Sequence, residues 1–104
     1  MGEKIEFNWI LKLHQKNLQQ LENNQTRRFT KEGHRIYPLE KLIDLVDENF
    51  VTYGAVQIKE YSFSKDEKGN NITKGRYNLV HLCTPEEKKV LTEYNQGKYH
   101  NSAF

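Results

Sequence analysis

The N-terminal part of the chain alternates between large apolar and polar residues. Large apolar side chains occupy every second position from Ile5 to Leu13, and only Ile10 interrupts the polar positions between them. Successive side chains of a strand point to opposite faces, so this period of two predicts a half-buried strand with one face in the core. The following residues, 14–26, are mostly Gln, Asn and Lys, which indicates a loop with a short helical turn.

Residues 39–46 fit two structures. Their apolar members have the spacing of one helical face, and Pro38 suits a first helical position. The same stretch contains an apolar run of strand length, residues 42–46, followed by good turn residues. The strand pattern of residues 51–63 favours the strand interpretation, because a short turn would pair the two segments. A helix stays the alternative.

The apolar side chains of residues 51–63 change face part-way along the predicted strand. Val56 and Ile58 share one face, whereas Tyr61 and Phe63 lie on the other, which predicts a bulge near Lys59-Glu60. Gly54 marks a second bend or a close approach of another backbone. Bends of this kind are how small sheets curl toward barrels.

A hairpin and another strand follow. Residues 64–73 form a polar tip with the turn at Gly69-Asn70, and residues 76–83 return as a strand that is apolar on both faces.

The end of the chain predicts a helix. Thr84 and Glu87 have the spacing of a capping box, and Pro85 suits the first turn. The helix is expected to run from about Pro85 to Gln96 and to stop at Gly97. Its apolar face would consist of Val90, Leu91 and Tyr94.

Together these patterns predict a mainly β (α+β) fold, a small bent sheet or β-barrel of about five strands with one C-terminal capping helix. The 104 residues fit one domain, placed at residues 1–97, with a flexible C-terminal tail at 98–104. Hydrophobic residues make up 36% of the chain and aromatic residues 12%, so the core is thin and rich in rings.

The formal net charge is +2, which is too small to indicate a nucleic-acid or membrane partner by itself. No apolar stretch approaches the roughly 18 residues that span a bilayer, and no signal peptide is visible at the start. The single cysteine, Cys83, cannot form an internal disulfide. We therefore expect a cytoplasmic protein without membrane contact.

Four scattered segments resemble a family of short uncharacterised proteins from Bacillus-type bacteria. The family pattern consists of Glu-Phe-Asn, Lys-x-Gly-x-Arg-x-Tyr-Pro, a Gly-rich apolar strand and Tyr-x-Leu-Val. The matching segments are Glu6–Asn8, Lys31–Pro38, Gly54–Ile58 and Tyr77–Val80. The helix from Pro85 departs from this pattern. The family has no assigned activity, so the resemblance implies no functional residue.

A more distant resemblance concerns the fold. The strand-turn-strand around Ile43–Asp47 is similar to PUA-like and ASCH-like β-barrels, which often bind RNA. RNA binding is thus what this resemblance implies, by analogy of fold.

Candidate catalytic and metal-binding residues do not assemble into a known pattern. His81 and Cys83 share a strand face, but a metal site needs three or four converging ligands. Cys83 as a nucleophile would need a base and a lowered pKa. We expect no enzyme activity, no metal and no cofactor.

Residues 27–37 hold the local excess of cations, and aromatic residues are interleaved with them. Cations on phosphates and rings stacked on bases are what binders of single-stranded nucleic acid use. Alternation along one hairpin would place Phe29 between the cations of one face, provided that Gly33 does not shift the register. The candidate binding residues are Arg27, Phe29, Lys31, His34, Arg35 and Tyr37.

The alternative is a solvated hairpin whose long side chains cover apolar surface, with Phe29 in the core. The leading functional hypothesis is a non-enzymatic binding module that acts through its surface, with RNA or single-stranded DNA as partner. The second hypothesis is a protein-binding or inhibitor protein, of the kind that phages and prophages use to block a host protein.

Overall fold

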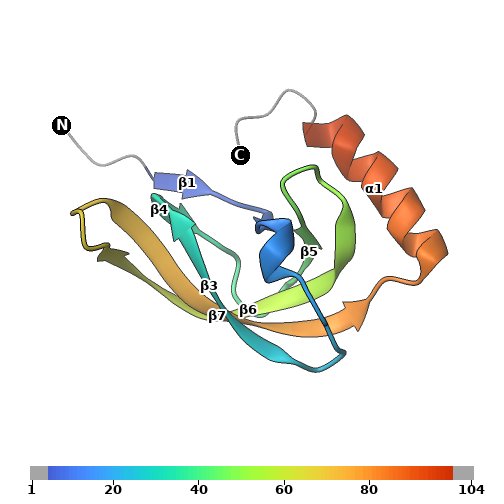
Figure 1. Ribbon diagram of the computed structural model, residues 1–104, viewed down its shortest axis with the longest axis horizontal. Coiled ribbons are helices and arrows are strands. Elements are labelled where there is room, and N and C mark those ends of the chain that lie inside the picture. Colours follow the sequence, from blue (N-terminus) through green and yellow to red (C-terminus); the bar gives the residue numbers. More distant parts are fainter. Residues whose placement is uncertain (1–4, 100–104) are drawn as a thin grey trace.

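The computed structural model describes residues 5–99, which form two sheets and a C-terminal helix (Figure 1). In chain order the elements are β1 (Ile5–Phe7), β2 (Ile10–Lys12), the 3-10 turn η1 (Gln15–Asn17), β3 (Thr26–Glu32), β4 (His34–Ile36), β5 (Leu42–Val46), β6 (Thr52–Lys65), β7 (Asn71–Leu82) and α1 (Pro85–Tyr99). The predicted mainly β fold with one C-terminal helix is therefore confirmed.

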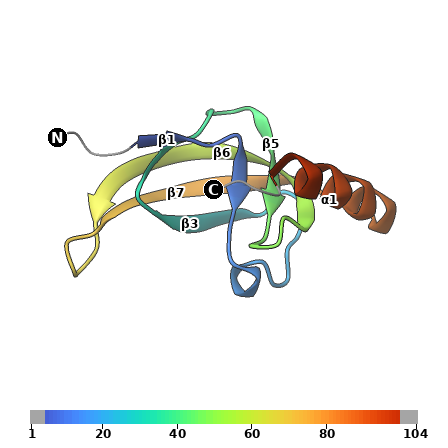
Figure 2. The ribbon, with the colours of Figure 1, turned by 90° about the horizontal axis from the view of Figure 1, so that it is seen from above.

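The main sheet has five strands in the order β2-β5-β6-β7-β3, and β1 pairs with β4 in a separate parallel pair. The long strands β6, β7 and β3 run side by side, and the β6–β7 tip lies at the opposite end of the molecule from α1 (Figure 2). Within residues 5–99 no ladder joins the end strands β2 and β3, so the sheet is bent but open. Of the two predicted forms, the bent sheet is correct and the closed barrel is not.

Residues 42–46 form the strand β5, as the turn residues after them suggested, and β5 pairs antiparallel with β6. The predicted bulge is also present, since the register between β6 and β7 shifts between Ile58 and Glu60. Gly54 lies at a close approach of two backbones. A Cβ atom built there would lie 2.2 Å from the carbonyl oxygen of His81, so the two strands can meet at this distance only with glycine.

The predicted strand from Ile5 to Leu13 is wrong in two respects. It is broken at Asn8-Trp9 into β1 and β2, which belong to different sheets. The second error concerns burial, because the alternation of buried and exposed side chains does not continue through the break. Ile10 and Leu11 are both buried, whereas Ile5, Phe7 and Trp9 are 48%, 65% and 62% exposed.

The capping box at the start of α1 is confirmed. Thr84 N–H donates to Glu87 Oε1 at 2.9 Å, and Glu87 N–H donates to Thr84 Oγ1 at 3.2 Å. The predicted stop at Gly97 is wrong, because the helix continues to Tyr99. Lys98 and Tyr99, placed in the predicted tail, are thus helical, and residues 100–104 lie outside the described range. The division into a domain at 1–97 and a tail stays a prediction.

The predicted apolar face of α1 is also wrong. Val90 and Tyr94 are exposed, and the helix docks through polar and aromatic groups instead. The buried Asn95 amide donates to Asp44 Oδ2 at 3.0 Å and to Thr52 Oγ1 at 2.8 Å. Helix docking therefore rests on a satisfied buried amide, which hydrophobicity along the helix does not reveal.

Candidate functional site

The predicted binding residues of segment 27–37 lie close together but do not form one hairpin. Gly33, with a φ of 81°, separates β3 from β4, and these strands pair with β7 and β1 respectively. Five of the six predicted residues contact other segments on the inner side of the bent sheet or between β4 and β1, and the sixth, His34, contacts Phe63, whereas Arg28 is exposed on the outer face.

Arg27 is engaged by the loop that follows η1. Its guanidinium donates to the carbonyl oxygens of Asn17, Gln19 and Gln20 at 3.2, 2.6 and 2.9 Å, and its Nε donates to Gln25 Oε1 at 3.0 Å. Four acceptors on one side chain fix the loop against β3. A phosphate group would have to replace these bonds in order to bind Arg27.

Lys31 is largely buried and donates from Nζ to the carbonyl oxygen of Lys12. Burial, and then the positive charges of Arg35 and Lys12, lower the pKa of Lys31 to about 8. Its ammonium group therefore bridges β3 to the end of β2, across the open side of the sheet.

Arg35 connects β4 to β1. Its Nε donates to the carbonyl oxygen of Glu32 at 2.8 Å, and its Nη1 donates to Asn8 Oδ1 at 3.0 Å. The same nitrogen lies 3.4 Å from Glu6 Oε2. Arg35 thereby turns the polar side chains of β1 toward the body of the protein.

The three rings of the predicted set also pack against other side chains of the protein. Phe29 and Tyr37 are buried, and their rings meet edge to face with centroids 5.5 Å apart. The ring of His34 is buried and stacks on Phe63 at 4.3 Å. The placement of Phe29 in the core was the structural alternative in the sequence analysis, and none of the three rings presents a free face for a base. The role of the six residues in binding stays a prediction.

The outward face of β1 is a feature that the sequence analysis missed. Ile5 and Phe7 of β1 are exposed, as is Trp9 in the break that follows, while Asn8 is buried and Glu6 is held by Arg35. We call the surface formed by Ile5, Phe7 and Trp9 the β1 face. The pattern is inverted relative to an ordinary half-buried strand, with apolar groups outside and polar groups inside. The alternation revealed two faces but not which one is buried. The signal for a change at this point was Ile10, which breaks the alternation next to Trp9.

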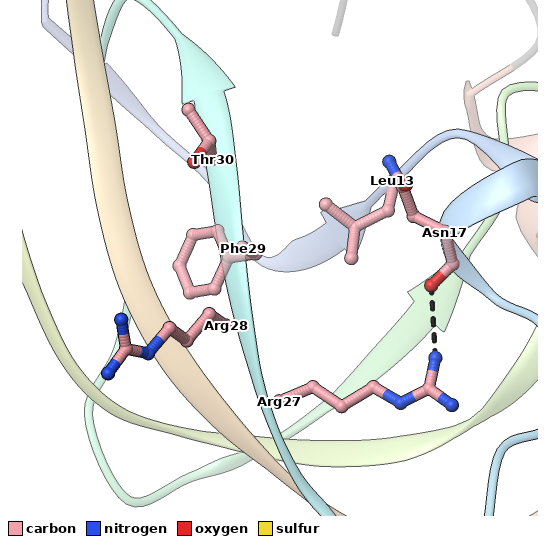
Figure 3. Close-up of a pocket in the computed structure, with 6 residues that line it drawn as sticks. All are labelled: Leu13, Asn17, Arg27, Arg28, Phe29 and Thr30. Atoms are coloured by element: carbon pink, nitrogen blue, oxygen red, sulfur yellow. Dashed lines mark hydrogen bonds between the residues drawn. The ribbon is translucent and has the colours of Figure 1, made fainter.

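A hollow of about 440 Å³ borders β3 on its unpaired side (Figure 3). Its walls are β3 on one side and residues 13–17 on the other, and Figure 3 shows the Leu13 side chain pointing toward β3. A second hollow of about 240 Å³ continues along the strand and shares Leu13, Asn17 and Thr30 with the first. We call this gap between β3 and residues 13–17 the seam.

The outer face of the main sheet contains a shallow groove of about 800 Å³. Arg28, Lys74 and Arg76 line it, together with hydroxyl groups of Thr30 and Ser62. The Arg76 side chain is paired with Glu60 at 3.0 Å, whereas the side chains of Arg28 and Lys74 have no hydrogen-bond or ion-pair partner within residues 5–99. This groove is the cationic surface that remains available to a partner.

Within residues 5–99 no group of three or more His, Cys, Asp or Glu side chains is placed to hold a metal ion. Burial raises the pKa of the Cys83 thiol, and the nearby Glu87 adds to this effect, which opposes formation of a thiolate. Among the described residues no helix has the length and apolar content needed to cross a membrane.

The comparisons with known proteins concern the fold. No family model matches the chain, and no curated protein matches it. Among solved structures, it is similar to the X-ray crystal structure of protein ytmB from Bacillus subtilis, with a TM-score of 0.59 and 23% identity. The likeness covers 82% of this chain and 98% of ytmB. At this identity it shows a shared fold and nothing of function. The resemblance to a Bacillus-type family stays a prediction.

Proposed function

We propose that this chain is a non-enzymatic protein-binding module that contacts its partner through the outward face of β1. The observation that carries the proposal is a set of three exposed apolar side chains, Ile5 and Phe7 on the inverted strand β1 and Trp9 just after it. Single exposed apolar residues are common on protein surfaces, but neighbouring ones on a fixed strand are typical of interaction sites. Trp is also among the residues that contribute most to binding energy at interfaces.

The β1 face is held in place before any partner arrives. Arg35 binds Asn8 and Glu6 from the inside, and Asn8 N–H donates to the carbonyl oxygen of Ile36 at 2.8 Å. A surface that is already ordered loses less conformational entropy on binding. The apolar side chains consequently cannot turn inward without breaking the contacts of Arg35.

Trp9 makes the proposal testable, because it is the single tryptophan of the sequence. Its fluorescence reports directly on the proposed surface, and quenching by iodide should be strong in the free protein. A photo-crosslinking residue at position 7, with position 67 at the exposed hairpin tip as control, would capture the partner in the expressing cells.

The proposal expects discrete protein adducts at position 7 that excess unlabelled protein suppresses. An excess of the Phe7→Ser/Trp9→Ser variant should not suppress them, since each truncated hot-spot side chain costs about 2 kcal/mol or more of binding. Both side chains are exposed, so the variant should unfold like the original protein. Equal labelling at positions 7 and 67 would contradict the proposal, and adducts with a second copy alone would make the face a dimer contact.

Nucleic-acid binding is the second candidate, and the groove on the outer face of the main sheet is what favours it. Arg28 and Lys74 offer cations that no described residue neutralises. Labelled RNA and DNA oligonucleotides at about 50 and 200 mM salt test it, because contacts to phosphates weaken steeply with salt. Loss of binding in Arg28→Ala/Lys74→Ala, with binding intact in Phe7→Ser/Trp9→Ser, would favour this function over the first.

A further inference from the structure

The strand β3 has an open edge that faces the seam. Leu79 N–H donates to the carbonyl oxygen of Gln25 and Gly33 N–H donates to that of Asn71, both at 2.8 Å, just before and just after β3. Both bonds fit the register in which Phe29 faces Gly75. Hydrogen-bonded pairs alternate along an antiparallel ladder, so the odd-numbered residues of β3 bond to β7.

It follows that the even-numbered residues of β3 direct their N–H and C=O groups into the seam. The backbone groups of Arg28 and Thr30 have no hydrogen-bond partner within residues 5–99. An open edge of this kind is a template for another strand. The seam provides space along it, since the two connected hollows extend from Arg27 to Glu32.

The seam differs chemically on its two faces. Toward the inside it is lined by the apolar side chains of Leu13 and Phe29, between the side chains of Arg27 and Lys31. Toward the outside Arg28 is exposed and free of partners among the described residues. Side chains of an added strand alternate between these two faces. An apolar residue would therefore meet Leu13 and Phe29, and its neighbours would meet Arg28.

A second copy of β3 is a poor occupant. The strand carries Arg27, Arg28 and Lys31 against a single acidic residue, Glu32, so two copies edge to edge would bring like charges together. We propose that the seam binds an extended segment of a partner protein with alternating apolar and acidic residues, which pairs with β3 as an added strand. This surface is separate from the β1 face, and the inference stands whether or not β1 binds a partner.

A short end-blocked peptide of alternating glutamate and valine is the probe, and a peptide of alternating lysine and valine is its control. NMR of the isotope-labelled protein should show fast amide exchange at Arg28 and Thr30 in the free protein, beside protected amides at Phe29 and Lys31. The acidic peptide should protect Arg28 and Thr30, and the basic peptide should not.

Two variants separate strand pairing from simple charge attraction. Thr30→Pro removes an N–H that points into the seam and leaves the ladder with β7 intact, so it should weaken binding by about tenfold relative to Thr30→Ala. Arg28→Glu should reverse the preference, so that the basic peptide binds better than the acidic one. Circular dichroism identical to that of the original protein confirms that both variants fold.

Three results would overturn the inference. They are protected amides at Arg28 and Thr30 in the free protein, equal binding by Thr30→Pro and Thr30→Ala, or no binding of the acidic peptide at about 1 mM. Peptide-induced shifts confined to Ile5 and Phe7 would likewise exclude the seam while supporting the β1 face. If an oligonucleotide binds at Arg28 more tightly than the acidic peptide, and its affinity falls with salt, the partner at this site is a nucleic acid and not a protein segment.

Discussion

Replacing Gly54 by alanine tests the close approach of β6 and β7 directly. The added Cβ would lie 2.2 Å from the carbonyl oxygen of His81 and 3.2 Å from Leu79 Cδ1. The oxygen belongs to the backbone of a paired strand, so no side-chain rotation can make room. The strands must separate locally, at a point where the register already shifts between Ala55 and Val56.

The expected cost of Gly54→Ala has two parts. Overpacking a well-packed site costs typically 1–3 kcal/mol, and each ladder hydrogen bond that the separation breaks adds about 1 kcal/mol. We therefore expect a loss of about 3 kcal/mol, a large share of the roughly 5–15 kcal/mol that stabilises a domain. The melting temperature should fall by more than about 10 °C.

Gly97→Ala is the matched control, since it makes the same chemical change in α1. A Cβ atom at Gly97 meets nothing within 4 Å, and alanine is the better helix former, so this variant should gain about 0.5 kcal/mol. Urea unfolding with equal m-values for the three proteins would measure both differences. A midpoint for Gly54→Ala equal to that of the original protein would refute the described pairing of β6 with β7.

Three further predictions concern the helix and the ionisable groups. Thr84→Ala should lower the free energy of unfolding by about 1 kcal/mol, whereas Thr84→Ser should melt close to the original protein. An unchanged melting midpoint for Thr84→Ala would contradict the capping role. Asn95→Ala should cost about 1–3 kcal/mol in the same assay because it leaves the buried Thr52 hydroxyl without its donor, and a neutral result would show that α1 docks by other contacts. The pKa of Lys31 is about 8 in the folded protein and 10.5 in the unfolded chain, so the unfolded chain binds more protons between these values and the free energy of unfolding, measured with urea, should rise with pH across this range. Burial raises the pKa of Tyr37, so stability should fall again above about pH 10. A pH profile that Lys31→Met leaves unaltered would refute the assignment of the rise to Lys31.

Local signals in the sequence predicted the elements that local chemistry determines. The capping box at Thr84 and the bulge after Ile58 each depend on neighbouring residues, and each is present. The hairpin tip is also present, but its hydrogen-bonded turn is Asp66–Gly69 and not Gly69-Asn70 as predicted. Gly69 has a φ of 84°, which explains glycine at that turn. The strand at Leu42–Val46 was also correct, because the turn after it linked it to a clear partner strand.

Sequence patterns did not determine which strands are neighbours or which face is buried. Period two assigns Ile5 and Phe7 to one face of a strand, but only the contact of Arg35 with Glu6 and Asn8 decides that this face points outward. The same limit applies to the predicted basic site. Charge spacing brought Arg27, Lys31 and Arg35 to one side, but it does not identify their hydrogen-bond acceptors. These include the backbone carbonyls of Lys12, Gln19 and Glu32 and the side-chain oxygen of Asn8.

The strand order has a consequence for folding during synthesis. β3 pairs with β7 and β2 with β5, so the first third of the chain obtains its neighbours only from segments made later. Thr26 pairs with Asn78, and at roughly 5–20 residues per second their synthesis is separated by about 3 to 10 s. During that interval the nascent chain displays Phe7, Trp9 and an unpaired β3 to the cell. A chaperone or an early partner could contact these segments before the sheet is complete.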